Sequence, residues 1–348
     1  MIRMNLPTLL LKPIITQKKL AMRRITFRTL SMTIAMLFLG LGLATAQTAK
    51  EAVEAFNAGV TANQEKDYPL ALSLFTKAIE IGTQVGTEAD GIRIQAEGVV
   101  ANIQFSIGMG LYNQKKIEEA IVEITKAKEL AIKYDDQKTL AKAEKTIPQF
   151  YNFLGNSALR EGQAEKAIEN YSKCITLDST YVRSYLGLGR AYIKLNNYEK
   201  ALATFDKTIK VGTTANKMEE VQDAKKMACS ITLMNAGMEQ KKENFANCYK
   251  FATQALTYDD QNLDAFMKIA ISANKLSKFD EAIENINKAL PLVEAKDDAT
   301  KAPYYFHLAE AYVGKKDNIS ACGAYKKASF GIYKDAAEYQ VNKVLKCQ

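Results

Sequence analysis

The chain has 348 residues, of which 47% are apolar and 25% are charged. This balance excludes an intrinsically disordered protein and supplies enough apolar material for an extended core. The formal net charge of +8 is concentrated at the start of the chain. Residues 1–46 contain seven basic residues and no acidic residue, and the remainder carries 40 basic against 39 acidic residues. The charge therefore gives no reason to expect a nucleic-acid partner.

Residues 1–46 have the pattern of a leader. Three arginines between positions 23 and 28 precede an apolar run over 30–43, and a small-x-small cleavage pattern ends at Ala46. The run is shorter than the roughly 20 residues that span a bilayer. We therefore expect a secretory signal peptide that is cleaved after Ala46, with Met22 as an alternative translation start. An uncleaved membrane anchor and a mitochondrial presequence are the other interpretations.

This leader predicts an exported protein. The expected location is a bacterial periplasm or cell envelope, with no integral membrane span left after cleavage. An exported chain can also form disulfide bonds, because the compartments outside the cytosol are oxidising.

Seven stretches of the mature chain share one spacing. An anchor residue, usually Ala, is followed four positions later by a large residue and seven positions later by a small one, and Gly or Ala stands twelve positions before it. The clearest copy has Gly189, Ala201, Phe205 and Thr208 in these places. In chain order the anchors are Ala71, Ala120, Ala167, Ala201, Cys248, Ala282 and Ala321.

The spacing has a simple physical meaning. Offsets of three, four and seven put residues on one face of a helix. Small residues on such a face let two helix axes approach to about 8–10 Å, and the large residue fills the space between neighbouring pairs. The pattern therefore predicts a row of antiparallel helix pairs.

This pattern resembles the tetratricopeptide repeat, a helix-turn-helix unit of 34 residues. Two anchor intervals, 167–201 and 248–282, equal 34 residues. The tryptophan typical of the first helix is absent, and aromatic residues take that place in four copies: Tyr151, Tyr185, Phe266 and Tyr305. The resemblance implies an all-α fold, a right-handed superhelical solenoid of about seven hairpins over residues 48–330, with a C-terminal capping helix over 331–348.

The remaining anchor intervals are longer than 34 residues. We expect longer hairpins over 88–134, 137–175 and 214–258, with the added residues shared between two helices. Thr87 and Asp90 have the spacing of a capping box before a helix. Pro148 is expected to start or kink the first helix of the third repeat.

The residues that carry most enzymatic chemistry are scarce. The single histidine, His307, excludes a HExxH zinc site, and a catalytic triad would have to use it. We expect His307 on a helix surface or facing the groove, no catalytic site, no metal site and no cofactor. An enzyme with an unrecognised site would need clustered carboxylates.

Five cysteines follow the leader, and none is part of a CxxC motif. Cys322 and Cys347 lie at similar distances on either side of a turn expected near residues 332–335. On antiparallel helices they would lie level with each other, which makes them a candidate disulfide. Two independently buried thiols are the alternative.

By the resemblance, the first helices of stacked hairpins line a concave groove that binds segments of other proteins. Carried over by position, the groove residues are Phe105, Met109, Tyr112, Asn113, Gln149, Asn152, Asn156, Arg183, Arg190 and Lys194. Amides can pair with a ligand backbone, and Arg can pair with a carboxylate. The set does not match the family's carboxylate clamp, because only Asn156 fits that pattern. These polar residues could also form merely solvated helix faces.

The expected function is a non-enzymatic interaction scaffold that binds a protein or peptide segment in this groove. The alternative is a structural or assembly factor that self-associates into a homo-oligomer through its convex face or its cap.

Overall fold

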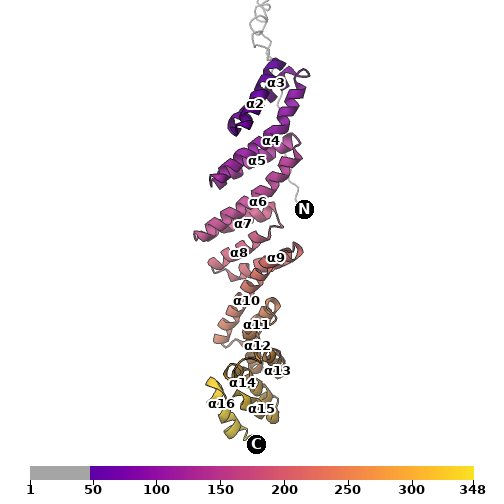
Figure 1. Cartoon of the computed structure of the whole chain (residues 1–348). Helices are drawn as coiled ribbons and strands as arrows, with labels where there is room; N and C mark the ends of the chain where they lie inside the picture. Colours follow the sequence, from indigo (N-terminus) through magenta and orange to yellow (C-terminus); the bar gives the residue numbers. More distant parts are fainter. Residues whose placement is uncertain (1–47) are drawn as a thin grey trace, which may run out of the picture.

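The computed structural model describes residues 48–348, so the expected signal peptide lies outside the described residues. The helices follow one another as seven antiparallel pairs stacked in chain order, which gives an elongated array (Figure 1). The first helices of the pairs are α2 (Ala49–Gln64), α4 (Asp90–Asn113), α6 (Gln137–Arg160), α8 (Val182–Lys194), α10 (Met218–Lys241), α12 (Leu263–Lys275) and α14 (Asp298–Gly314). The second helices are α3 (Tyr68–Val85), α5 (Ile117–Lys133), α7 (Ala164–Leu177), α9 (Tyr198–Thr214), α11 (Phe245–Tyr258), α13 (Phe279–Ala289) and α15 (Asn318–Ala328).

All seven hairpin turns are closed in the same way. One residue of each turn adopts the left-handed conformation: Lys66, Lys115, Gly162, Asn196, Glu243, Ser277 and Lys316. The next amide donates to a carbonyl five residues back in the first helix, at 2.8–3.0 Å in every hairpin. This bond satisfies a carbonyl that the helix end would otherwise leave unpaired. The repeated turn explains why seven dissimilar sequences form hairpins of one geometry.

Large side chains of the second helices fill the gaps between small residues of the first helices. Tyr171 of α7 is fully buried between Gly155 of α6 and Gly187 of α8. A Cβ at either glycine would lie 2.6 Å from Cε1 of Tyr171. Phe205 of α9 lies against Gly189 in the same manner. The expected packing of small and large residues, and with it the all-α solenoid of seven hairpins, is confirmed.

The first helices form the inner side of the array. Each first helix contacts the first helix of the next hairpin, from α2 to α14, and the second helices of the described residues form no comparable row. A stack whose first helices approach one another more closely than its second helices must curve toward the first helices. The concave side is therefore lined by the first helices, as the resemblance implies.

The added residues of the long repeats are distributed differently from our expectation. Helices α4, α6 and α10 each have 24 residues, whereas α8 has 13. The second helices α7 and α11 have only 14 residues each. The first helix thus takes most of the extra length, and the expectation of equal sharing was wrong. Long first helices widen the concave side rather than the whole hairpin.

Two expected helix-start signals were also wrong: Pro148 does not start the first helix of the third repeat, and no capping box forms at Thr87. Pro148 lies inside α6, which begins eleven residues earlier at Gln137 and is capped there by the side chain of Asp136. The predicted capping box at Thr87 does not form, because Ala89 is the N-cap residue of α4 and no side chain caps that helix. By contrast, Asn197 caps α9 by accepting a hydrogen bond from the Lys200 amide at 3.2 Å.

After α15 the chain turns through a short 3₁₀ segment, Gly331–Tyr333, into α16 (Lys334–Tyr339) and a π-helical turn over Gln340–Val344. Ala337, Val341 and Leu345 pack on the last apolar cluster, which includes Tyr325 and Leu308. This segment is the C-terminal capping helix of the solenoid, and it covers apolar surface that the seventh hairpin alone would leave exposed.

Cys322 of α15 and Cys347 are joined by a disulfide in the structure, with their Cα atoms 5.7 Å apart. Cys174, Cys229 and Cys248 are buried free thiols. Burial raises the pKa of the Cys174 thiol to about 11, so this thiol stays protonated and unreactive at neutral pH.

The state of the cysteines gives the first prediction. The unfolded protein purified without reductant should accept three alkyl groups from a rapid thiol reagent, and five after reduction. The disulfide closes the loop between Cys322 and Cys347, and closure of this loop should stabilise the docked capping helix by about 3 kcal/mol. Mass spectrometry counts the groups, and five before reduction would show that Cys322 and Cys347 are free thiols.

Candidate functional site

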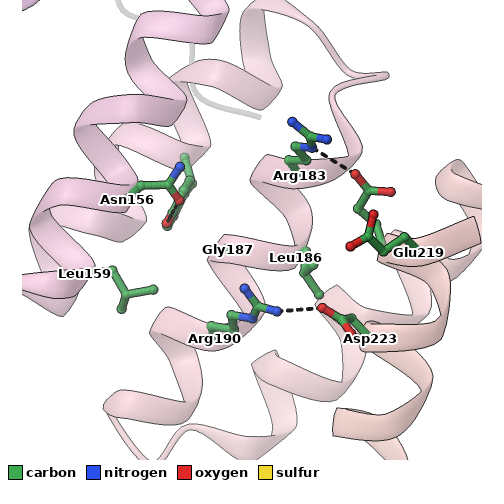
Figure 2. A pocket seen from close by; sticks show the side chains of 10 residues that line it. Asn156, Leu159, Arg183, Leu186, Gly187, Arg190, Glu219 and Asp223 are labelled. Carbon is green, nitrogen blue, oxygen red and sulfur yellow. Dashed lines mark hydrogen bonds and ion pairs between the residues drawn. The ribbon is translucent and has the colours of Figure 1, made fainter. Parts of the chain in front are cut away.

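The concave side carries a hollow where α6, α8 and α10 meet, with a volume of about 300 Å³. We call it the ion-pair hollow. Figure 2 shows its side chains, with Asn156 on one wall, two arginines of α8 in the middle and carboxylates of α10 on the other wall. Its lining consists of Asn156, Leu159, Tyr171, Arg183, Leu186, Gly187, Arg190, Glu219, Glu220 and Asp223.

Two ion pairs connect α8 to α10 across this hollow (Figure 2). Arg183 Nε donates to Glu220 Oε1 at 2.9 Å, and Arg190 Nη2 donates to Asp223 Oδ2 at 2.9 Å. The hydrogen bond from Arg183 holds the pKa of the Glu220 carboxyl below its ordinary value, and the same bond raises the pKa of Arg183. Both groups therefore stay charged at neutral pH. The two pairs fix the position of α8 relative to α10.

Not every polar group in the ion-pair hollow is satisfied by the protein. Nε of Arg190 is buried and has no hydrogen-bond acceptor among the described residues. Asn156 accepts a hydrogen bond from the Tyr171 hydroxyl through Oδ1 at 2.7 Å, which leaves its amide NH₂ group free to donate. Burial raises the pKa of Tyr171 to about 12, so its hydroxyl remains a donor. The hollow thus presents donors that a ligand carbonyl could accept from.

A second hollow of about 620 Å³ lies beside the first, between the end of α4 and the second half of α6. We call it the aromatic hollow. Its lining consists of Tyr112, Asn113, Lys115, Ile117, Phe153, Asn156, Ser157 and Arg160. Asn156 therefore belongs to both hollows, which makes them neighbouring parts of one groove.

Stacked rings form the apolar wall of the aromatic hollow. The Tyr112 ring lies 4.6 Å from that of Phe150 at an interplanar angle of 13°, and 6.1 Å from that of Phe153 at 21°. Phe150 is buried, whereas Phe153 is 38% exposed. Such contacts between rings fix their orientation. Phe153 is therefore a rigid apolar surface that faces solvent.

The structure places most of the expected groove residues around these two hollows, but one expectation was wrong. Asn152 is 3% exposed and accepts a hydrogen bond from Ser184 Oγ at 3.0 Å. It therefore joins α6 to α8 and cannot contact a ligand. Phe105 and Met109 are partly buried and pack on a core cluster with Ile124, so they serve mainly as structural contacts.

The other expected residues are accessible. Asn113 and Asn156 line the hollows described above, and Arg183 and Arg190 form the two ion pairs. Gln149 is half-buried on α6, and Lys194 is exposed at the end of α8. Neither Gln149 nor Lys194 lines the two hollows. Whether any of these residues touches a partner stays a prediction.

The acidic wall and the exposed aromatic ring of Phe153 were not predicted from the repeat spacing. Glu219, Glu220 and Asp223 lie in the first two turns of α10, in the part by which this helix exceeds α8. A position-by-position transfer from a 34-residue repeat has no place for them. Phe153 could have been found, because it follows Asn152 directly and lies two positions before the packing residue Gly155.

The described residues give no sign of metal or membrane chemistry. No group of three or more His, Cys, Asp and Glu side chains within 48–348 is arranged to hold a metal ion. In the same part of the chain, no helix combines the length and the apolar character needed to cross a membrane. Asn262 is the N-cap of α12 and accepts a hydrogen bond from the Ala265 amide at 3.0 Å.

The Arg183–Glu220 pair predicts a pH dependence of stability. Because the folded-state pKa of Glu220 is lowered, its contribution is present above its ordinary pKa and disappears as the pH falls through the folded value. Glu220→Gln should lower the thermal midpoint at pH 7, and the difference from wild type should become smaller at pH 3, below the ordinary carboxyl pKa. Thermal unfolding followed by circular dichroism at several pH values measures the difference in thermal midpoint.

Glu199→Gln is the matched control, since Glu199 is an exposed carboxyl on α9 outside both hollows. It should leave the midpoint close to wild type throughout. A Glu220→Gln variant with the same deficit at pH 3 as at pH 7 would show that the ion pair is not the cause.

The chain is similar to known proteins that contain tetratricopeptide repeats. A family model described as "Tetratricopeptide repeat" matches residues 158–215, which include α7, α8 and α9. The TPR repeat-containing protein MJ1428 of Methanocaldococcus jannaschii is 24% identical over 272 residues, which cover 70% of this chain and 43% of the relative. The U-box domain-containing protein 70 of Oryza sativa subsp. japonica is 30% identical over 130 residues, 37% of this chain and 14% of that protein. The chain thus spans less than half the length of either curated relative.

Among solved structures, that of the MamA protein is similar at 20% sequence identity and a TM-score of 0.33, covering 57% of this chain and 94% of MamA. The structure of YrrB, described as a TPR protein with an unusual peptide-binding site, has 18% identity and a TM-score of 0.32, with 57% and 88% coverage.

Proteins built from tetratricopeptide repeats are generally non-enzymatic scaffolds that mediate protein–protein interaction. Residues 158–215 of this chain thus match the tetratricopeptide-repeat model, and the other hairpins of the described residues repeat the turn geometry of that segment.

Proposed function

We propose that this chain is a non-enzymatic scaffold that holds a segment of a partner protein in the groove formed by α4, α6, α8 and α10. The observation that carries the proposal is the adjacency of two hollows of different chemistry on the concave side, with Asn156 in both. An extended peptide could place an apolar side chain in the aromatic hollow and a polar side chain in the ion-pair hollow.

The leader supports a cellular location for this function. Its basic start, apolar run and small-x-small pattern favour export to the periplasm or cell envelope. The disulfide between Cys322 and Cys347 is compatible with that location, because structural disulfides persist in oxidising compartments. The partner would then be another envelope protein.

The groove can be tested without disturbing the ion pairs. Phe153 and Arg160 are both exposed, and Arg160 is in no ion pair of the described residues. In-cell crosslinking followed by purification and mass spectrometry should recover a partner with wild type. The double variant Phe153→Ala with Arg160→Ala should lose that partner at least about tenfold.

A matched control is Leu177→Ala with Lys210→Ala, which removes an exposed apolar residue and an exposed cation from second helices. It should keep the partner. If a folded groove variant recovers the same partners as the control, the interface lies outside the groove.

A second candidate function, self-association, is favoured by one observation at the C-terminal end. Ile319 is 89% exposed and Ile332 is 94% exposed, and Tyr339 and Val344 of the capping segment are also exposed. Terminal repeats of solenoids ordinarily present a polar outer face. Exposed apolar side chains there are typical of a contact surface.

Self-association predicts a concentration-dependent sedimentation coefficient. Ile319→Asp with Ile332→Asp should abolish the concentration dependence, because a charge in an apolar contact is costly to bury. Both side chains are exposed in the single chain, so the variant should fold. Sedimentation velocity over a hundredfold range of concentration measures the effect. A wild-type coefficient that stays constant at the value of a single chain would contradict this function.

A further inference from the structure

We propose that the groove selects an extended peptide by the order of its charges relative to an apolar anchor. In this peptide an acidic residue beside an aromatic or large apolar residue occupies the aromatic hollow, and a basic residue about five positions away from the anchor meets the acidic wall of α10. This inference rests on the groove function proposed above and specifies its ligand.

The aromatic hollow provides the apolar anchor. Phe153 is exposed, and its ring is held by Tyr112 and by the buried Phe150. Because Phe150 already fills the space beneath, Phe153 cannot turn inward to remove its ring from water. A ligand side chain that covers this ring would bury apolar surface at small entropic cost, since both rings of the wall are already ordered.

The charges around the aromatic hollow favour an acidic neighbour of that anchor. Its lining includes two basic residues, Lys115 and Arg160, and no acidic residue. Neither cation takes part in an ion pair among residues 48–348. The nearby carboxylate of Glu161 accepts a hydrogen bond from Ser157, so two cations stand against one carboxylate here, and a ligand carboxylate would meet net positive charge.

The ion-pair hollow has the opposite character. Arg183 and Arg190 are already neutralised by Glu220 and Asp223, and Glu219 is exposed and lies outside these pairs. Its lining therefore has three carboxylates against two guanidinium groups. A ligand carboxylate would be repelled here, and a ligand Lys or Arg would be attracted to Glu219.

The ion-pair hollow also has a place for the ligand backbone. Arg190 Nε is buried without an acceptor, and the Asn156 side-chain NH₂ lies on the opposite wall of the hollow (Figure 2). A peptide carbonyl between them would supply the missing acceptor without adding charge. Since Asn156 lines both hollows, one chain can run from the aromatic hollow to this point without a break.

The spacing of the two ligand charges follows from the helix packing. Adjacent helices pack about 8–10 Å apart, and the aromatic hollow lies about two such steps from α10. An extended chain advances about 3.3 Å per residue, so the distance corresponds to about five or six residues.

Fluorescence anisotropy with labelled synthetic peptides tests the proposal. The probe Gly-Glu-Phe-Gly-Ser-Gly-Ser-Lys-Gly should bind the purified chain at least about tenfold more tightly than the same peptide with Glu and Lys exchanged, or with Phe replaced by Ala. Equal binding of all three peptides, or none by any of them, would overturn the proposed order of charges.

Two groove variants connect the peptide preference to the residues. Phe153→Ala should weaken the Phe peptide about tenfold and leave the Ala peptide unchanged. Glu219→Lys should weaken the original probe about fivefold and strengthen by a similar factor a probe with Asp in place of its Lys. Glu199→Lys, a matched exposed charge reversal on α9, should change neither affinity. If Glu219→Lys does not reverse the preference between the Lys probe and the Asp probe, the acidic wall of α10 does not determine which ligand charge binds.

The outcome can be separated from that of the groove function. A partner that crosslinks to wild type and is lost in the Phe153→Ala, Arg160→Ala variant establishes the groove whatever the peptides do. If that partner is captured while the probes show no preference, the groove function stands and the order of ligand charges proposed here is wrong.

Discussion

The structure depends on one packing constraint, the insertion of a large side chain from six of the seven second helices, all but α11, between small residues of the first helices. Tyr171 shows it most clearly, since it touches Gly155 of its own hairpin and Gly187 of the next. A Cβ at either position would have to displace an aromatic ring that is fully buried, so the small residues set how closely α6 and α8 approach. The same ring carries its hydroxyl to Asn156 in the groove. A core contact thus also orients a side chain of the candidate site.

The second determinant is the length of the first helices. With 24 residues, α10 extends about eleven residues beyond a short first helix such as α8, or about 16 Å of additional helix. The added turns bring Glu220 and Asp223 opposite Arg183 and Arg190. The groove at this point is therefore not the surface of a standard repeat. It has an acidic wall that exists only because the helix was lengthened, and that wall neutralises the two arginines.

Much of the fold could be predicted from the sequence, and the reason is physical. The offsets of four and seven after anchors such as Ala201 describe a local packing unit, and a solenoid is a sum of such units. The conformation of the turns was harder to predict from the sequence, because Glu243 and Lys115 adopt a left-handed conformation that their residue types disfavour. The repeated hydrogen bond in each turn holds them there, which no single position of the sequence shows.

The candidate site was less predictable because it arises between repeats of unequal length. Transfer by position placed Asn152 in the groove, but the approach of α6 and α8 that Gly155 and Gly187 permit leaves Asn152 bonded to Ser184 and buried. It also missed the acidic wall that the α10 extension creates. An arginine in a groove of this kind is easily taken as a carboxylate receptor. Here the charges of Arg183 and Arg190 are already compensated by Glu220 and Asp223, so a ligand carboxylate would meet no excess positive charge at this hollow. The free cations lie instead at the aromatic hollow, on Lys115 and Arg160. The electrostatic character of each part of this groove therefore follows from the distribution of compensated and uncompensated charge, rather than from the presence of arginine.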